Sequence, residues 1–186
     1  MPPSNTVVRR LALAGLLLAL GLVLPVFAHS VGMGRVLLPM HLPVLLGGFL
    51  AGPATGSLLG AVTPLASAVL TGMPPLAPPV AQAMALELAA YGSVSGLLYH
   101  HTRIRLVPCL VVAMVLGRLV YGFIGYAILP LFGFTQVPLL YPLTYGVVTG
   151  LPGIGAQLVL VPTLVYLVQK HTGSFARPVT PRVPGR

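Results

Sequence analysis

Long apolar segments separated by short polar connections dominate this chain, and they leave few folds open to it. Only 6% of its 186 residues are charged and 56% are hydrophobic, whereas a typical soluble domain has about 25% charged residues. Such a chain cannot cover a water-facing surface, so the sequence predicts an integral membrane protein. Six apolar segments can be drawn, at residues 11–28, 36–51, 54–70, 80–99, 106–131 and 143–168.

These segments predict an all-α protein with six transmembrane helices in a single domain covering residues 1–186. A membrane helix needs about 20 apolar residues, and the segments lack the alternation expected of barrel strands. Segment 36–51 is short and contains Pro39 and Pro43. The proline-rich stretch 71–79 predicts a loop between the third and fourth helices, and residues 171–186 are expected to form a flexible tail.

The net charge of +9 comes from residues that flank the apolar segments, which argues against a nucleic-acid-binding surface. With six spans, the basic clusters at residues 9–10, 100–105 and 170–186 all fall on one side of the membrane. The positive-inside rule identifies that side as the cytoplasm, so both termini are expected there. Only Arg35 lies in an opposite connection.

A cleaved signal peptide is the alternative interpretation of the N-terminus. Arg9 and Arg10, the apolar run and the sequence Val26-Phe27-Ala28 match its three regions. Cleavage would leave five spans. The apolar run exceeds the usual length of about 7–15 residues, which favours a retained helix.

Glu87 is the only acidic residue of the chain and lies inside an apolar segment. A charge at the centre of a membrane helix costs roughly 2.5–3.5 kcal/mol on insertion scales, so Glu87 is expected to have a partner. Arg118 is the other charge well inside an apolar segment, at nearly the same predicted depth. Two interpretations stay open: the residues form a buried ion pair, or they bind a polar ligand in a cavity that opens outward.

Five further polar residues are candidates for the same cavity. Tyr91 lies one turn from Glu87, and Tyr121 lies nearly one turn from Arg118. Gln157, midway along the sixth segment, needs a hydrogen-bond partner in lipid, which either a neighbouring helix or a ligand would supply. Arg35 and His41 belong to the first outer connection and the start of the second span, where Arg35 would favour an anionic ligand group.

Catalysis and metal binding have little support in the sequence. HExxH, GxSxG and P-loop motifs are absent, and one carboxylate cannot supply an acid/base pair. The single Cys109 excludes a disulfide framework. His29, Met33, Met40, His41 and Met73 are scattered soft ligands, but no motif unites them. We therefore expect neither a cofactor nor a resident metal.

The block from Leu38 to Gly60 contains Leu-Pro-Met-His-Leu-Pro-Val-Leu-Leu-Gly-Gly, followed by Gly-Pro-Ala-Thr-Gly-Ser-Leu-Leu-Gly. It resembles the substrate-binding S components of energy-coupling factor (ECF) transporters. This family commonly shows Ile/Leu-Pro-x-Leu-Leu-x-Gly and then Gly-Pro-x-x-Gly-x-x-x-Gly in its second and third helices. The specific motif covers residues 38–75, and the predicted topology extends the resemblance to the whole chain.

The resemblance implies a high-affinity subunit that binds a vitamin or related micronutrient in the plasma membrane of a prokaryote. Such a subunit is not an enzyme. It docks on a transmembrane coupling protein driven by two cytoplasmic ATPases, and its first outer loop closes over the ligand. Members often carry an Ala-x-x-x-Ala pair on the first helix for docking, and Gly15 and Ala19 are the nearest match. Several members have an acidic residue after the last glycine of the motif, where this chain has Ala61.

Two alternatives remain beside the vitamin-type S component. One is a membrane protein without a transport role, such as an intramembrane enzyme or an assembly factor. The other is a metal-ion S component, although nickel and cobalt members use a Met-His pair at the chain terminus and Met40-His41 is internal. A channel is disfavoured because prolines are many and polar residues few. The ligand is left open among pantothenate, folate, a pyridine vitamin, a corrinoid and a queuosine precursor, with a weak preference for an anionic group.

Overall fold

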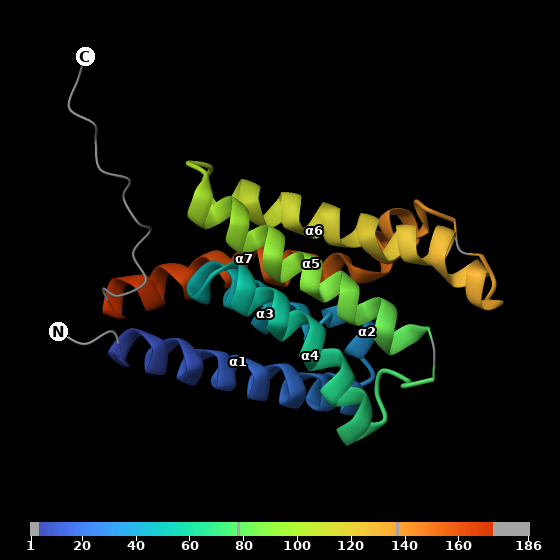
Figure 1. Cartoon of the computed structure of the whole chain (residues 1–186), viewed down its shortest axis with the longest axis horizontal. Coiled ribbons are helices and arrows are strands. Elements are labelled where there is room, and N and C mark those ends of the chain that lie inside the picture. Colours follow the sequence, from blue (N-terminus) through green and yellow to red (C-terminus); the bar gives the residue numbers. More distant parts are fainter. Residues whose placement is uncertain (1–3, 78, 137, 173–186) are drawn as a thin grey trace, which may run out of the picture.

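The computed structural model describes residues 4–172 except 78 and 137, and this part is helical, without β-strands. The helices run roughly side by side along the long axis of a bundle (Figure 1). The predicted tail falls mainly on residues 173–186, outside the described residues. The elements are α1 (Ser4–Ser30), α2 (Gly34–Leu37), α3 (His41–Ala51), α4 (Pro53–Thr71), α5 (Val80–His101), α6 (Leu106–Phe123), the π-helical turn η1 (Ile124–Ile128), the 3-10 turn η2 (Leu129–Phe132) and α7 (Tyr141–Thr172).

Helices of the described residues support four of the six predicted spans by their length and composition. Four stretches of the described residues are long and apolar enough to cross a membrane: 7–30, 53–71, 106–132 and 146–171. Helix α5 has 22 residues, but Gln82 and Glu87 reduce its mean hydropathy. Helix α3 has 11 residues, about 17 Å at 1.5 Å per residue, against a hydrocarbon core of about 30 Å.

The second predicted segment, 36–51, is broken where the prediction drew one helix. Leu38 has φ +49° and ψ +51°, the left-handed conformation, which is unusual for a bulky residue. Pro39 follows it and disfavours right-handed helix at the preceding position. The chain therefore turns after α2, and α3 begins at His41.

Glycine residues bring α3, α4 and α5 into close backbone contact. Gly52, at φ +98°, ends α3, and Pro53 begins α4. A Cβ atom added to Gly56 would lie 2.6 Å from the Gly92 carbonyl oxygen of α5 and 2.7 Å from Gly48 Cα of α3. Small residues spaced by four allow this approach of helices in lipid. The result is a tightly packed three-helix unit.

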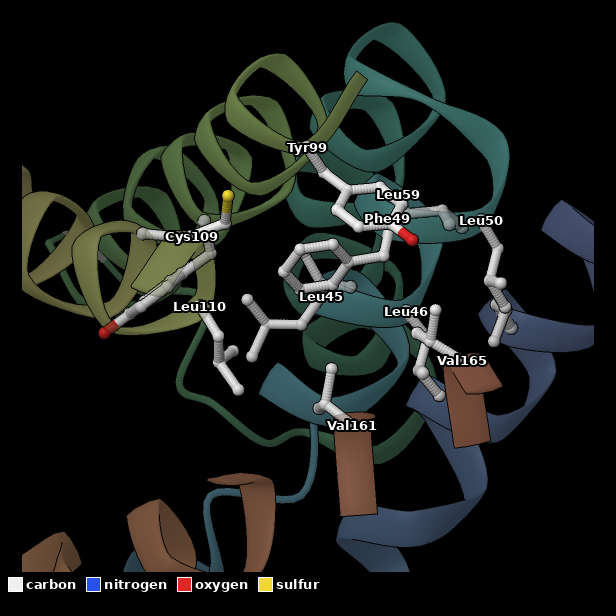
Figure 2. Packing of buried hydrophobic residues seen from close by; sticks show 14 of the residues in the cluster. Leu45, Leu46, Phe49, Leu50, Leu59, Tyr99, Cys109, Leu110, Val161 and Val165 are labelled. Atoms are coloured by element: carbon white, nitrogen blue, oxygen red, sulfur yellow. The ribbon is translucent and has the colours of Figure 1, made fainter. Parts of the chain in front are cut away.

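The apolar core lies where this unit meets α6 and α7. Figure 2 shows Phe49 and Leu45 of α3 facing Leu110 of α6 and Val161 of α7. Phe49 is fully buried, and its ring meets that of Tyr99 edge-on, with the ring centres 5.3 Å apart. Edge-to-face pairs at this separation add about 0.5–1.5 kcal/mol beyond the area that they bury. These apolar contacts therefore fix the position of α3 beside α5, α6 and α7.

The two ends of the bundle differ in charge. The start of α1, the connection between α5 and α6, and the end of α7 lie at the same end (Figure 1). They carry Arg9 and Arg10, Arg103 and Arg105, and Lys170. This is the shared placement that the charge pattern predicts. Helix α2, the α4–α5 connection, η1 and η2 lie at the opposite end.

Candidate functional site

Glu87 lies in the third turn of α5, on the face that points into the bundle. Its side chain is only 4% exposed, and its Oε1 atom lies 3.2 Å from Arg118 Nη1 of α6. The Tyr91 hydroxyl, one turn along α5, donates a hydrogen bond of 3.3 Å to the same oxygen. The expected proximity of Glu87 and Arg118 is therefore confirmed, and it takes the form of an ion pair.

The ion pair offsets the solvation that Glu87 and Arg118 lose on burial. A buried ion loses several kcal/mol of solvation, which attraction repays only when the geometry is good and further hydrogen bonds are made. The Tyr91 hydroxyl supplies one such bond to Glu87. The pair joins α5 to α6 in the half of the bundle away from the basic clusters.

His41 lies beside this pair at the start of α3. Its Nε2 atom is 3.9 Å from Glu87 Oε1, and its ring lies edge-on to the Tyr91 ring with the centres 5.0 Å apart. The residue is 2% exposed. Neither ring nitrogen has a hydrogen-bond partner among the described residues. Unpaired buried polar atoms are uncommon in proteins, and each calls for an explanation.

A cavity of about 210 Å³ adjoins these residues between α3, α5, α6 and α7. Its wall is mostly apolar, with four polar side chains at defined points. Such a composition is typical of small-molecule sites, where apolar walls provide contact area and a few polar groups fix orientation. The lining residues are Leu38, His41, Tyr91, Val111, Met114, Val115, Arg118, Val147, Ile154, Gln157 and Leu158.

The connection between α2 and α3 covers one side of the cavity and is seated on α7. Gln157 is 2% exposed, and its amide Nε2 donates a long hydrogen bond of 3.4 Å to the Leu38 carbonyl. A Cβ atom on Gly153 would lie 2.6 Å from the Val36 carbonyl oxygen. Any larger residue at position 153 would overlap the backbone of α2. The close contact that glycine allows supports the left-handed turn at Leu38.

Five of the predicted site residues come together in the structure: Glu87, Arg118, Tyr91, His41 and Gln157. Tyr121 is half-buried on α6 and does not line this cavity. Arg35 is part of α2, but its side chain lies outside what the structure describes.

The predicted docking pair lies away from the cavity. Gly15 and Ala19 are exposed on α1, and a Cβ atom on Gly15 would have no neighbour within 4 Å. Helix α1 packs on α3 and α4 through its other side. The pair is therefore accessible to a partner from outside the bundle.

Most of the apolar wall was missed by the reasoning from polar residues. Val111, Met114 and Val115 stand at seven, four and three residues before Arg118, so they share its face of α6. That spacing was a usable signal. The contribution of Leu38 to the cavity wall could not be predicted from the sequence, because it depends on the turn that α7 supports.

Comparison with known proteins agrees with this architecture. No curated protein and no solved structure matches the chain. The model of the family described as "ECF transporter, substrate-specific component" matches residues 9–165, which include the helices that line the cavity and most of α7. The chain therefore belongs to the substrate-specific components of ECF transporters, membrane subunits that work with a coupling protein and ATPases.

Proposed function

We propose that this protein is the substrate-binding subunit of an ECF importer for a vitamin or related micronutrient in the plasma membrane of a prokaryote. The observation that carries the proposal is the cavity beside the Glu87–Arg118 pair in a chain of this family. We further propose that six helices traverse or enter the membrane with both termini in the cytoplasm. The cavity then lies in the outer half of the bundle.

The site residues have separate roles in this proposal. Arg118, His41 and Gln157 orient the polar part of the ligand, and Tyr91 and Glu87 hold Arg118 in place. Helix α2, which contains Arg35, and the connection that follows it cover the ligand. Gly15 and Ala19 form the surface that docks on the coupling protein. ATP hydrolysis belongs to the partner ATPases, in keeping with the absence of a P-loop from this sequence.

Among the described residues, no group of three or more His, Cys, Asp or Glu side chains could hold a metal ion. The family match also favours a transport role over an intramembrane enzyme or assembly factor.

Co-purification tests the proposed function. The full chain, expressed with an ECF coupling protein and its two ATPases, should form a complex in mild detergent and restore ATP-dependent uptake of its ligand by proteoliposomes. A known S component serves as the positive control. Failure to assemble under conditions where that control assembles would refute the transport role.

A further inference from the structure

The charges around the cavity restrict the ligand more closely than the family does. Building on the proposed function, we propose that the ligand is a compact molecule of about single-ring size that carries no net charge when bound. It would present a carbonyl-type oxygen to Arg118 and a second polar group to His41. This class replaces the anionic preference that the sequence suggests.

Charge balance is the first argument. Among the side chains that the structure describes around the cavity, Glu87 and Arg118 are the only ones with a permanent charge, and they are paired. An anion on the remaining N–H groups of Arg118 would place a second negative charge beside the buried Glu87 carboxylate, with one guanidinium to compensate both. A cation on Glu87 would likewise place a second positive charge beside Arg118. A neutral ligand, or a zwitterion, keeps the balance.

Hydrogen-bonding capacity is the second argument. A guanidinium group has five N–H donors, and Glu87 Oε1 is the acceptor that the ion pair occupies. Because Arg118 also lines the cavity, a ligand carbonyl oxygen can accept from another of its N–H groups while the ion pair stays intact. The unpaired, buried ring of His41 offers one donor and one acceptor in its neutral form. An amide on an aromatic ring matches both requirements.

Size is the third argument. An apolar cavity of about 150 Å³ accommodates benzene. On that scale the 210 Å³ found here corresponds to about eight or nine non-hydrogen atoms. A monocyclic amide fits this volume, whereas a folate or a corrinoid is far larger.

Three probes of equal size and different charge test the charge assignment: benzamide, benzoate and benzamidine. Binding to the purified full chain in detergent is measured by titration at pH 7. Benzamide should bind the wild type at least about tenfold tighter than either ion, a difference of roughly 1.4 kcal/mol. Tighter binding of benzoate or benzamidine, or binding of none of the three, would overturn the proposal.

Charge-changing variants show whether the ion pair causes that preference. Glu87→Gln leaves Arg118 unpaired, so benzoate should become the tightest probe. Arg118→Gln leaves Glu87 unpaired, so benzamidine should become the tightest, and this second variant keeps the test open if the first does not fold. A preference for benzamide that survives in every folded variant would show that the pair does not select the ligand.

The natural ligand gives an independent readout. Mass spectrometry of the small molecule retained by the wild type should identify a net-neutral compound of about single-ring size. A retained monoanion or a polycyclic ligand would refute the class. If the chain assembles with the coupling protein and the retained molecule is a monoanion or a polycyclic compound, only the proposed ligand class is refuted, and the transport role stands. If it binds benzamide and does not assemble, the transport role fails instead.

Discussion

Breaking the Glu87–Arg118 ion pair should destabilise the fold as well as alter the site. At the observed 3.2 Å, two unit charges attract by about 5 kcal/mol with an effective dielectric constant of about 20. Removing one partner of a buried pair costs about 3–5 kcal/mol, because the other charge stays buried without compensation. Arg118→Gln is therefore expected to reduce the free energy of unfolding by about 3 kcal/mol or more.

A double-mutant cycle separates the pair from its surroundings. Glu87→Gln should cost a similar amount, and the double variant should cost clearly less than the two single losses added together, because neither charge is then left alone. The free energy of unfolding is measured by equilibrium denaturation in mixed micelles. Arg103→Gln, at an exposed position of the α5–α6 connection, is the matched control and should change stability by less than about 0.5 kcal/mol.

Two results would refute this reasoning. Single variants that lose less than about 1 kcal/mol would show that water or another group compensates the remaining charge. Additive losses in the double variant would show that Glu87 and Arg118 act independently in spite of their proximity.

Three further predictions concern packing, docking and binding. Gly92→Ala should lose about 1–3 kcal/mol in the same unfolding assay, because the new Cβ atom overlaps the backbone of α4, whereas Gly15→Ala should not be destabilised. Ala19→Trp should abolish co-purification with the coupling protein while leaving ligand binding intact. The control Val69→Trp, on the exposed face of α4, should co-purify normally. Equal recovery of the two variants would exclude α1 as the docking surface. His41→Phe should fold with unchanged or higher stability, because each unpaired buried polar group costs about 1–3 kcal/mol. It should nevertheless bind benzamide more weakly in titrations. An unstable variant with normal affinity for benzamide would contradict the role given to the ring.

The sequence was most informative where a local rule decides the structure. Gly52-Pro53 encodes its own turn, because glycine adopts positive φ and proline begins a helix readily. The depth of Glu87 and Arg118 follows from counting residues along two antiparallel helices, and this was enough to predict that they lie at nearly the same level, with an ion pair as one of two interpretations.

Long-range contacts decided what the sequence could not show. The break at Leu38 needs glycine at position 153 of α7, more than 100 residues away, to admit the α2 backbone. Tyr121 was predicted at the site because it lies one turn from Arg118. Side chains on a helix lean toward its N-terminus, however, so Arg118 reaches back over Met114 and Val115, and Tyr121 lies one turn away in the other direction.

The position of Glu87 links the stability of the bundle to the site. Helix α5 is less apolar than its neighbours because it carries Gln82 as well as Glu87, so its place in the membrane depends on contacts with other helices. The glycine contacts with α3 and α4 supply one set of these contacts, and they need no charge. The pair with Arg118 supplies the other on the opposite side, against α6.

Because the glycine contacts hold α5 independently, small movements of Arg118 toward a ligand need not unfold the helix. A ligand that leaves the ion pair intact would then add its own contacts to the α5–α6 junction, and one acid would serve both the fold and the proposed site.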